Sequence, residues 1–246
     1  MTSSMDGLLN ALHYPVARAR EHYYSRYVDA ITLLLRTIVR NSNPDALVLD
    51  VGCGYASYAT PWREFCRYVV GMDMSPTIRN NTWVGSRVRG DAYHVPLPQN
   101  SVDLIIMRFV VEHLERPLDA LREAARVLRP GGKLVLLTPN RRHYVAQLAL
   151  LTPLWFHRWY FGRLGWAEEE IYPTLYRANT PGELKKAAGS VGLHLAELEM
   201  YEGPPGYLEG YWVPYLLGVA YERLVNRFRA LAGFRTCMLA TLQKPS

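Results

Sequence analysis

The segment LVLDVGCGYAS, residues 47–57, constrains the fold of this chain more than any other. Four apolar residues and an aspartate, a pattern typical of a strand buried on both faces, run directly into two glycines that are one residue apart. Glycine permits a turn with positive φ and allows a ligand to approach the backbone closely. This combination predicts an open α/β sheet that binds a ligand at the carboxyl ends of its strands.

The remainder of the chain alternates strand-like apolar runs with segments that have helical spacing. Such alternation predicts a mostly parallel sheet covered on both faces by helices, which is a doubly wound α/β domain. The predicted strands are 46–51, 68–72, 84–89, 102–107, 132–138, 194–200 and 235–242. The predicted helices are 23–40, a segment that contains 61–65, 112–128, 181–191 and 213–231.

Length and composition favour one large domain with insertions. The 246 residues are close to the size at which single cores stop growing, and 49% of them are hydrophobic. We expect an N-terminal helical cap at 1–45, a ligand-binding core at 46–140 and a mostly helical, aromatic lid at 141–178. The core is expected to continue at 179–246 around a second helical insertion near 205–233.

Charge and cysteine content limit the location and the partners. The net charge of +6 allows acidic partners, but the arginines are spread along the chain and no nucleic-acid-binding module is recognisable. Cys53, Cys66 and Cys237 form no CxxC pair, and the first residues lack the pattern of a secretory signal. The apolar run 211–221 is too short to span a bilayer. We therefore expect a cytoplasmic protein that has no transmembrane segment. We also expect that it binds no nucleic acid.

The glycine turn disfavours two common ligands. A dinucleotide-binding fingerprint that begins at Gly52 would have glycine or alanine at its sixth position, where this chain has Ser57. A phosphate-binding GxxxxGK loop followed by Ser or Thr is also absent from the sequence. Hydride transfer from a nicotinamide cofactor and ATP binding are therefore disfavoured.

Three aspartates stand at or just after the ends of consecutive predicted strands. Asp50 lies at the end of the first strand, Asp73 follows the second within GMDMSP, and Asp91 follows the third within GDAYHVPLP. A carboxylate at Asp73 can accept hydrogen bonds from both hydroxyls of a ribose, and one at Asp91 can accept from an exocyclic amine. The three positions together predict a ligand that contains adenosine.

Four segments, in order and spacing, carry a resemblance to a known family. They are VLDVGCG, GMDMSP, GDAYHVPLPQNSVDLIIM and EHLERPLDALREAARVLRPGGKLVLLTPN. With them the chain resembles the class I S-adenosylmethionine-dependent methyltransferases, and within these the methyltransferase type 11 group that includes the quinone-biosynthesis enzymes. The resemblance is tight over 46–140 and implies a Rossmann-like, seven-stranded, mostly parallel sheet whose last strand is antiparallel.

The same resemblance implies the cofactor and the residues that hold it. Asp50, Gly52 and Gly54 are expected to line the methionine part of S-adenosylmethionine, whose product is S-adenosylhomocysteine. Asp73 is expected to hold the ribose. The remaining cofactor contacts are assigned to Met74, Asp91, Ala92 and Arg108.

Methyl transfer to a hydroxyl is helped by a general base, and histidine has a suitable pKa. His143, in TPNRRHYV, follows the fifth predicted strand at the ligand edge of the sheet, and His113, in VEHLERP, lies on the same rim. Both are candidate catalytic bases, and a structural role at the start of a helix is the alternative for His113. His, Asp and Glu show no convincing metal-ligand spacing, so we expect no metal.

Aromatic residues in the two helical insertions are expected to wall the acceptor pocket. The predicted pocket residues are Tyr144, Trp155, Trp159, Tyr176, Tyr211 and Trp212. The alternative is that the aromatic side chains form a small core of the lid itself. Arginines lie beside both insertions, and the segment 212–219 is apolar. A further alternative is therefore that this segment contacts the anionic surface of the inner membrane peripherally.

The sequence therefore predicts a methyltransferase that acts on a small molecule, with a hydroxyl oxygen as acceptor atom, in cofactor, glycan or specialised-metabolite biosynthesis. Two alternatives stay open. One is a carbon methyltransferase acting on a quinone-like, membrane-derived ring, and the other is a protein that binds the cofactor without transferring a methyl group. The sequence predicts neither the identity of the acceptor nor the oligomeric state.

Overall fold

The computed structural model describes residues 30–55, 65–163, 172–205, 208 and 212–246, without the side chains of Phe161, Arg163 and Trp212. Its centre is a seven-stranded sheet in the order β3-β2-β1-β4-β5-β7-β6. The strands are β1 Leu47–Val51, β2 Tyr68–Asp73, β3 Ser86–Arg89, β4 Val102–Arg108, β5 Leu128–Pro139, β6 His194–Tyr201 and β7 Cys237–Gln243. β7 is antiparallel to both of its neighbours, and the other pairs are parallel. The predicted sheet with its reversed last strand is confirmed.

The sheet is buried on both faces, because successive residues of its central strands point to opposite sides. On β4, Leu104 and Ile106 belong to a core shared with helix α3 (Ala30–Asn41). Ile105 and Met107 belong to the opposite core, which is shared with helices α5 (Pro117–Val127) and α8 (Pro181–Ser190). The apolar runs that predicted a parallel sheet therefore supply two cores, one on each face.

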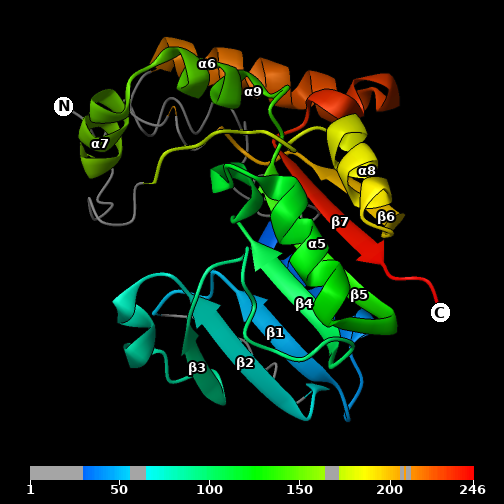
Figure 1. The fold of residues 1–246 in the computed structure, drawn as a ribbon. Coiled ribbons are helices and arrows are strands. Elements are labelled where there is room, and N and C mark those ends of the chain that lie inside the picture. Colours follow the sequence, from blue (N-terminus) through cyan, green and yellow to red (C-terminus); the bar gives the residue numbers. More distant parts are fainter. Residues whose placement is uncertain (1–29, 56–64, 164–171, 206–207, 209–211) are drawn as a thin grey trace.

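Three helices lie beyond the carboxyl ends of the parallel strands (Figure 1). They are α6 Tyr144–Leu151, α7 Leu154–Arg163 and α9 Trp212–Arg227. α6 follows the end of β5, and α9 lies in the connection between the end of β6 and the start of the reversed β7. The rings of Tyr144 on α6 and Tyr221 on α9 meet edge to face, with centroids 4.9 Å apart. These helices lie at the edge where open α/β sheets bind their ligands.

The predicted helix 112–128 is wrong at its amino-terminal end. Val111–His113 form a short 3-10 turn, η2, and α5 begins only at Pro117. The residue before a proline is kept out of the helical region, and Arg116 has φ −127° and ψ 68°. Proline suits the first position of a helix, so α5 starts there.

Other boundaries shift by smaller amounts. β3 begins at Ser86, two residues later than predicted, and β5 begins at Leu128, four residues earlier. The predicted helix 213–231 ends at Arg227 and is followed by the 3-10 helix η5, Arg229–Phe234. The first part of the predicted helix 23–40 and most of 61–65 lie outside the described residues. Within the part of the chain that the structure describes, no helix has both the length and the apolar character needed to cross a bilayer.

Candidate functional site

The turn after β1 requires glycine at two positions. Gly52 has φ +72° and Gly54 has φ +60°, values that residues with a side chain rarely adopt. A Cβ at Gly52 would also lie 2.4 Å from Cγ2 of Val110, which follows β4. A Cβ at Gly54 would meet no atom of the described residues within 4 Å. The turn is therefore packed against the end of β4 on one side, and none of the described residues covers Gly54.

Two side chains hold this turn at both polar groups of Gly54. Asp73, the last residue of β2, accepts the Gly54 N–H through Oδ2 and the Ser75 N–H through Oδ1, each at 2.8 Å. Asn81 is fully buried and donates from Nδ2 to the Gly54 carbonyl at 3.0 Å. The Asn81 Oδ1 accepts the Trp83 N–H at 2.9 Å. Asp73 was expected at this site, whereas the sequence analysis missed Asn81.

Cys53, between the two glycines, is a small buried filler. Burial and then the carboxylates of Asp50 and Asp73 raise the pKa of its thiol to about 12. The thiol therefore stays protonated near neutral pH and is not a nucleophile. Asp50 itself is 6% exposed and lies between Gly71 and Ile106 in the sheet.

Three further residues assigned to the cofactor lie after β2 and β3. The Asp91 carboxylate accepts the Tyr93 N–H at 2.7 Å, and Nδ1 of His94 lies 3.2 Å from it. Ala92 is buried, and Met74, directly after Asp73, is 69% exposed. An exposed thioether next to a carboxylate offers an apolar surface on which a flat ring can pack.

Phe109 joins this edge from β4, whose last residue is Arg108. It has φ +54° and is 38% exposed, and its N–H donates to the Leu137 carbonyl at 2.8 Å. Residues with a side chain seldom adopt positive φ, and those that do collect at functional sites. Phe109 follows β4 beside β1, where the strand order reverses and open sheets bind ligands. The sequence carries no signal for its backbone conformation, so it was missed.

His143 lies at the predicted edge, but both of its ring nitrogens have partners within the protein. Nδ1 accepts the Val145 N–H at 3.3 Å, which caps α6 and leaves the proton of the neutral ring on Nε2. Nε2 lies 3.0 Å from Thr236 Oγ1, and Thr236 in turn donates its hydroxyl and its N–H to Glu202, each at 2.9 Å. The ring is 4% exposed. Its assignment as a base stays a prediction that requires it to leave these partners.

His113 has a different geometry. Nδ1 lies 2.7 Å from the Pro173 carbonyl, which can only accept, so the ring donates there and Nε2 keeps its lone pair in the neutral ring. Burial lowers the pKa of His113, and the hydrogen bond to Pro173 opposes part of this shift. The side chain is 31% exposed.

Glu112, the neighbour of His113, was not singled out from the sequence. It is 3% exposed, and burial raises the pKa of its carboxyl to about 7, although a hydrogen bond from Thr138 Oγ1 at 2.9 Å opposes this shift. Its backbone carbonyl accepts the N–H groups of Leu175 and Tyr176, at 2.7 and 3.1 Å. Glu112 and His113 together fasten the segment 173–176 to the end of β4.

Four of the six predicted pocket residues have described side chains, and their role in a pocket stays a prediction. Tyr144 packs on His143, with ring centroids 4.3 Å apart, and Tyr176 is buried beside Glu112 with φ +51°. Trp155 and Trp159 on α7 are 69% and 49% exposed, and their described ring contacts are with Phe156. Tyr211 and the side chain of Trp212 lie outside the described residues.

Contact with a membrane surface stays a prediction. On α9, Val213, Leu217 and Leu224 are 45%, 67% and 49% exposed. Val213 and Leu217 belong to the segment 212–219 for which the contact is predicted, and Leu224 lies further along the same helix.

Comparison with known proteins shows which family the core of the sheet resembles. Residues 49–136 match the family described as methyltransferase domain. A relative in Mycolicibacterium smegmatis, named as a probable S-adenosylmethionine-dependent methyltransferase, is 37% identical over 127 residues, which are 50% of this chain and 48% of the relative. Residues 49–136 therefore match a methyltransferase domain, and the chain is similar over half of its length to a protein named as S-adenosylmethionine-dependent.

A second relative is the malonyl-[acyl-carrier protein] O-methyltransferase of Dechloromonas aromatica. It is 31% identical over 181 residues, which are 70% of this chain and 63% of the relative. The chain thus spans less than two-thirds of the length of either relative. The solved S-adenosylmethionine-dependent methyltransferase of Archaeoglobus fulgidus has the same fold, with a TM-score of 0.58, 18% identity and coverage of 85% of this chain and 91% of that one.

Among the described residues, no group of three or more His, Cys, Asp or Glu side chains is arranged to hold a metal ion.

Proposed function

We propose that this protein transfers a methyl group from S-adenosylmethionine to an oxygen atom of a small-molecule acceptor. The observation that carries the proposal is the glycine turn after β1, which Asp73 and Asn81 hold at both polar groups of Gly54 and which no described residue covers beside that glycine. The alignment of 70% of the chain with a relative named as an O-methyltransferase supports oxygen as the acceptor atom.

The residues around the turn fit the cofactor. Each carboxylate oxygen of Asp73 accepts one backbone N–H and retains a second lone-pair site, so the side chain can accept ribose hydroxyls without releasing the turn. The other residues that would hold the cofactor are Asp50, Gly52, Gly54 and Arg108 at the methionine part and Met74, Asp91 and Ala92 at adenine. When bound, S-adenosylmethionine supplies a methyl group on a sulfonium, which is already activated for attack by a nucleophile.

His113 is the general base in this proposal. Its Nδ1–H is held by the Pro173 carbonyl, and a histidine with a lowered pKa is neutral at pH 7, so Nε2 can accept the proton of an attacking hydroxyl. The remaining task of the protein is to align the acceptor oxygen with the methyl group and to exclude water. The helices α6, α7 and α9, which lie beyond the strand ends, are the elements placed to do this (Figure 1).

Binding and transfer test the proposal in two steps. Calorimetric titration with S-adenosylmethionine and with S-adenosylhomocysteine should give micromolar binding of both. Transfer of labelled methyl to a panel of hydroxyl, carboxylate and quinone-like acceptors should then label oxygen. Binding of neither cofactor form would reject the proposal, labelled carbon would support the carbon methyltransferase, and binding without any transfer across the panel would support the non-transferring alternative.

Replacing Asp73 by alanine should weaken binding of S-adenosylmethionine by about thirtyfold, since loss of a charge-assisted hydrogen bond costs about 2 kcal/mol. The variant loses the ribose acceptor and the brace on the Gly54 N–H together. Titration calorimetry measures the effect, with Asp45→Ala, an exposed aspartate before β1, as the matched control. Equal affinities of the two variants would refute the assignment of Asp73.

Replacing Asn81 by alanine should weaken cofactor binding by about tenfold, because the Gly54 carbonyl and the Trp83 N–H lose their partner and the turn is less well ordered. The adjacent Asn80 is exposed, so Asn80→Ala is a matched control. Both variants are compared by calorimetry and by urea unfolding. If the cofactor affinities of Asn81→Ala and Asn80→Ala agree within twofold, the hydrogen bonds of Asn81 have no part in cofactor binding.

A further inference from the structure

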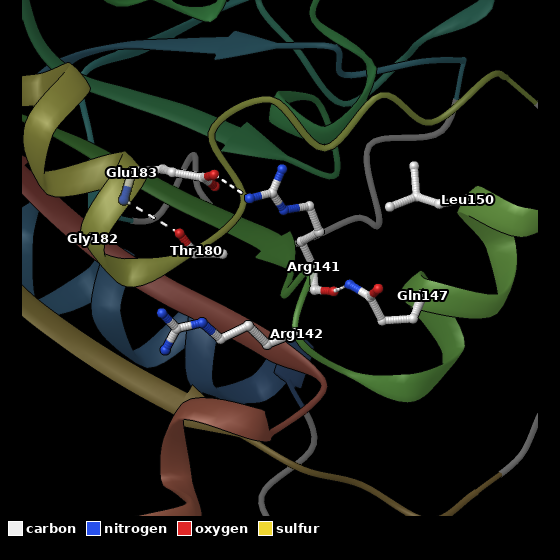
Figure 2. A pocket seen from close by; sticks show the side chains of 7 residues that line it. All are labelled: Arg141, Arg142, Gln147, Leu150, Thr180, Gly182 and Glu183. Atoms are coloured by element: carbon white, nitrogen blue, oxygen red, sulfur yellow. Dashed lines mark hydrogen bonds and ion pairs between the residues drawn. The ribbon is translucent and has the colours of Figure 1, made fainter.

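A second candidate site lies at the carboxyl end of β5, apart from the residues assigned to the cofactor. It is a cavity of about 610 Å³ where the chain enters α6 and where α8 begins (Figure 2). Its lining residues are Arg141, Arg142, Gln147, Leu150, Thr180, Gly182 and Glu183. β5 is paired with β4, so the cavity lies at the same edge of the sheet as the glycine turn, on the side of β4 away from it.

The cavity carries an excess of positive charge. Arg141 forms an ion pair with Glu183, and Figure 2 shows the two side chains directed at each other. Arg142 extends away from this pair (Figure 2) and has no ion-pair partner among the residues that the structure describes. Among the described lining residues, two guanidinium groups and one carboxylate therefore leave one excess positive charge.

The start of α8 adds to this field. Thr180 caps the helix by accepting the Glu183 N–H at 3.3 Å, and Pro181 occupies the first turn. The amino-terminal end of a ten-residue helix carries a partial positive charge that favours anions. A Cβ at Gly182 would meet no atom within 4 Å, so none of the residues that the structure describes blocks the approach to this end.

The backbone that carries the two arginines is held firmly. Asn140 is fully buried and donates from Nδ2 to the carbonyls of Gly233 and Arg235, both at 2.8 Å. Its Oδ1 accepts the Arg142 N–H at 3.1 Å, and the Arg141 N–H donates to the Asn179 carbonyl at 2.8 Å. A guanidinium on an anchored backbone loses less freedom when it binds a ligand.

We propose that this cavity binds an acidic group, a carboxylate or a phosphate, of the methyl acceptor through Arg142 and the start of α8. The guanidinium presents paired N–H donors that match both kinds of oxyanion. Leu150 and the amide of Gln147 give the cavity an apolar wall and a neutral polar group for the body of the same molecule. The identification of the ligand as the acceptor rests on the proposed function, whereas the binding of an oxyanion does not.

The test uses inorganic phosphate and malonate as probes, at constant ionic strength set with sodium chloride. Both should raise the melting temperature of the full chain saturably, because a ligand that binds only the folded state stabilises it. Arg142→Gln should lower the affinity for the more tightly bound probe by about tenfold. Arg36→Gln, at an exposed arginine of α3, should leave this affinity unchanged. Stronger binding of malonate indicates a carboxylate, and stronger binding of phosphate indicates a phosphate.

Two outcomes overturn the proposal: no saturable effect of either probe on the wild type, and equal effects in Arg142→Gln and Arg36→Gln. The affinity for S-adenosylmethionine, measured in the same variants, should be equal to that of the wild type. Failure of every form to bind the cofactor would reject the proposed function and leave the oxyanion site standing. For an acidic acceptor that the protein methylates, Arg142→Gln should raise KM about tenfold and leave kcat unchanged. An unchanged KM would show that the cavity does not bind the acceptor.

Discussion

Replacing His113 by asparagine is expected to lower turnover of a hydroxyl acceptor by about a hundredfold, with the affinity for S-adenosylmethionine unchanged. The asparagine amide can still donate to the Pro173 carbonyl, as Nδ1 of the histidine does at 2.7 Å, but it has no basic nitrogen. A loss of rate in this variant therefore reports the missing base and not a displaced segment 173–176. Steady-state transfer of labelled methyl and calorimetry of the cofactor measure the two quantities.

The pH profile separates a base from a structural histidine. Burial lowers the pKa of His113, so the wild type should be fully active at neutral pH and lose activity below about pH 6.5, as Nε2 gains a proton. His113→Asn should lack this acid limb. His194→Asn, at an exposed histidine that begins β6, is the matched control. Wild-type turnover in His113→Asn, or an acid limb that survives the change, would make His143 the better candidate.

The strands could be predicted from the sequence because each is a local pattern. Burial on both faces gives a continuous apolar run, and β1, β2 and β4 begin and end within one residue of their predicted positions. The start of α5 could not be predicted in this way. Leu114 continues the helical spacing although it precedes Pro117, because it is buried in the core beneath α5 and α8. An apolar residue at helical spacing shows only that its side chain is buried. Leu114 is buried from a loop, so its spacing wrongly extended the predicted helix.

Single residues of the candidate site could be predicted, but the contacts between them could not. Asp73 is conspicuous as an acid at the end of a buried strand, whereas Asn81 binds a carbonyl 27 residues away and nothing in its neighbourhood marks it. His143 lies at the predicted edge of the sheet. Its ring partner Thr236 is 93 residues away, so the closed network around the ring is a property of the fold and not of the motif.

Replacing Glu112 by glutamine is expected to increase stability above neutral pH. Glu112 is 3% exposed, and desolvation raises the pKa of its carboxyl from 4.5 to about 7. Between these two values the unfolded chain releases the proton while the folded protein keeps it. The stability associated with this proton is fully present below about pH 4.5 and is lost as the pH rises through about 7. Since one pKa unit corresponds to about 1.4 kcal/mol, the loss amounts to about 3 kcal/mol.

Glutamine does not titrate and can still accept the hydroxyl proton of Thr138, whose Oγ1 now donates to Glu112 at 2.9 Å. Relative to the wild type, Glu112→Gln should therefore gain about 3 kcal/mol in free energy of unfolding between about pH 4 and about pH 8. Urea unfolding at the two pH values measures this difference. Glu115→Gln, at an exposed carboxylate close by in the same loop, is the matched control and should gain little.

Among the described residues, Cys237 and His113 are titratable groups that face Glu112. Burial and then the carboxylates of Glu112 and Glu202 raise the pKa of the Cys237 thiol, so it stays neutral throughout the window. Nε2 of His113 lies 4.0 Å from Oε1 of Glu112, so the comparison is repeated in the His113→Asn background, where this ring cannot titrate. Parallel pH dependence of Glu112→Gln and the wild type in both backgrounds would mean that the carboxyl is hydrated and that the end of β4 is open to water. The predicted divergence would mean that the histidine proposed as base lies beside a buried carboxyl that ionises only near neutral pH, in surroundings that exclude water.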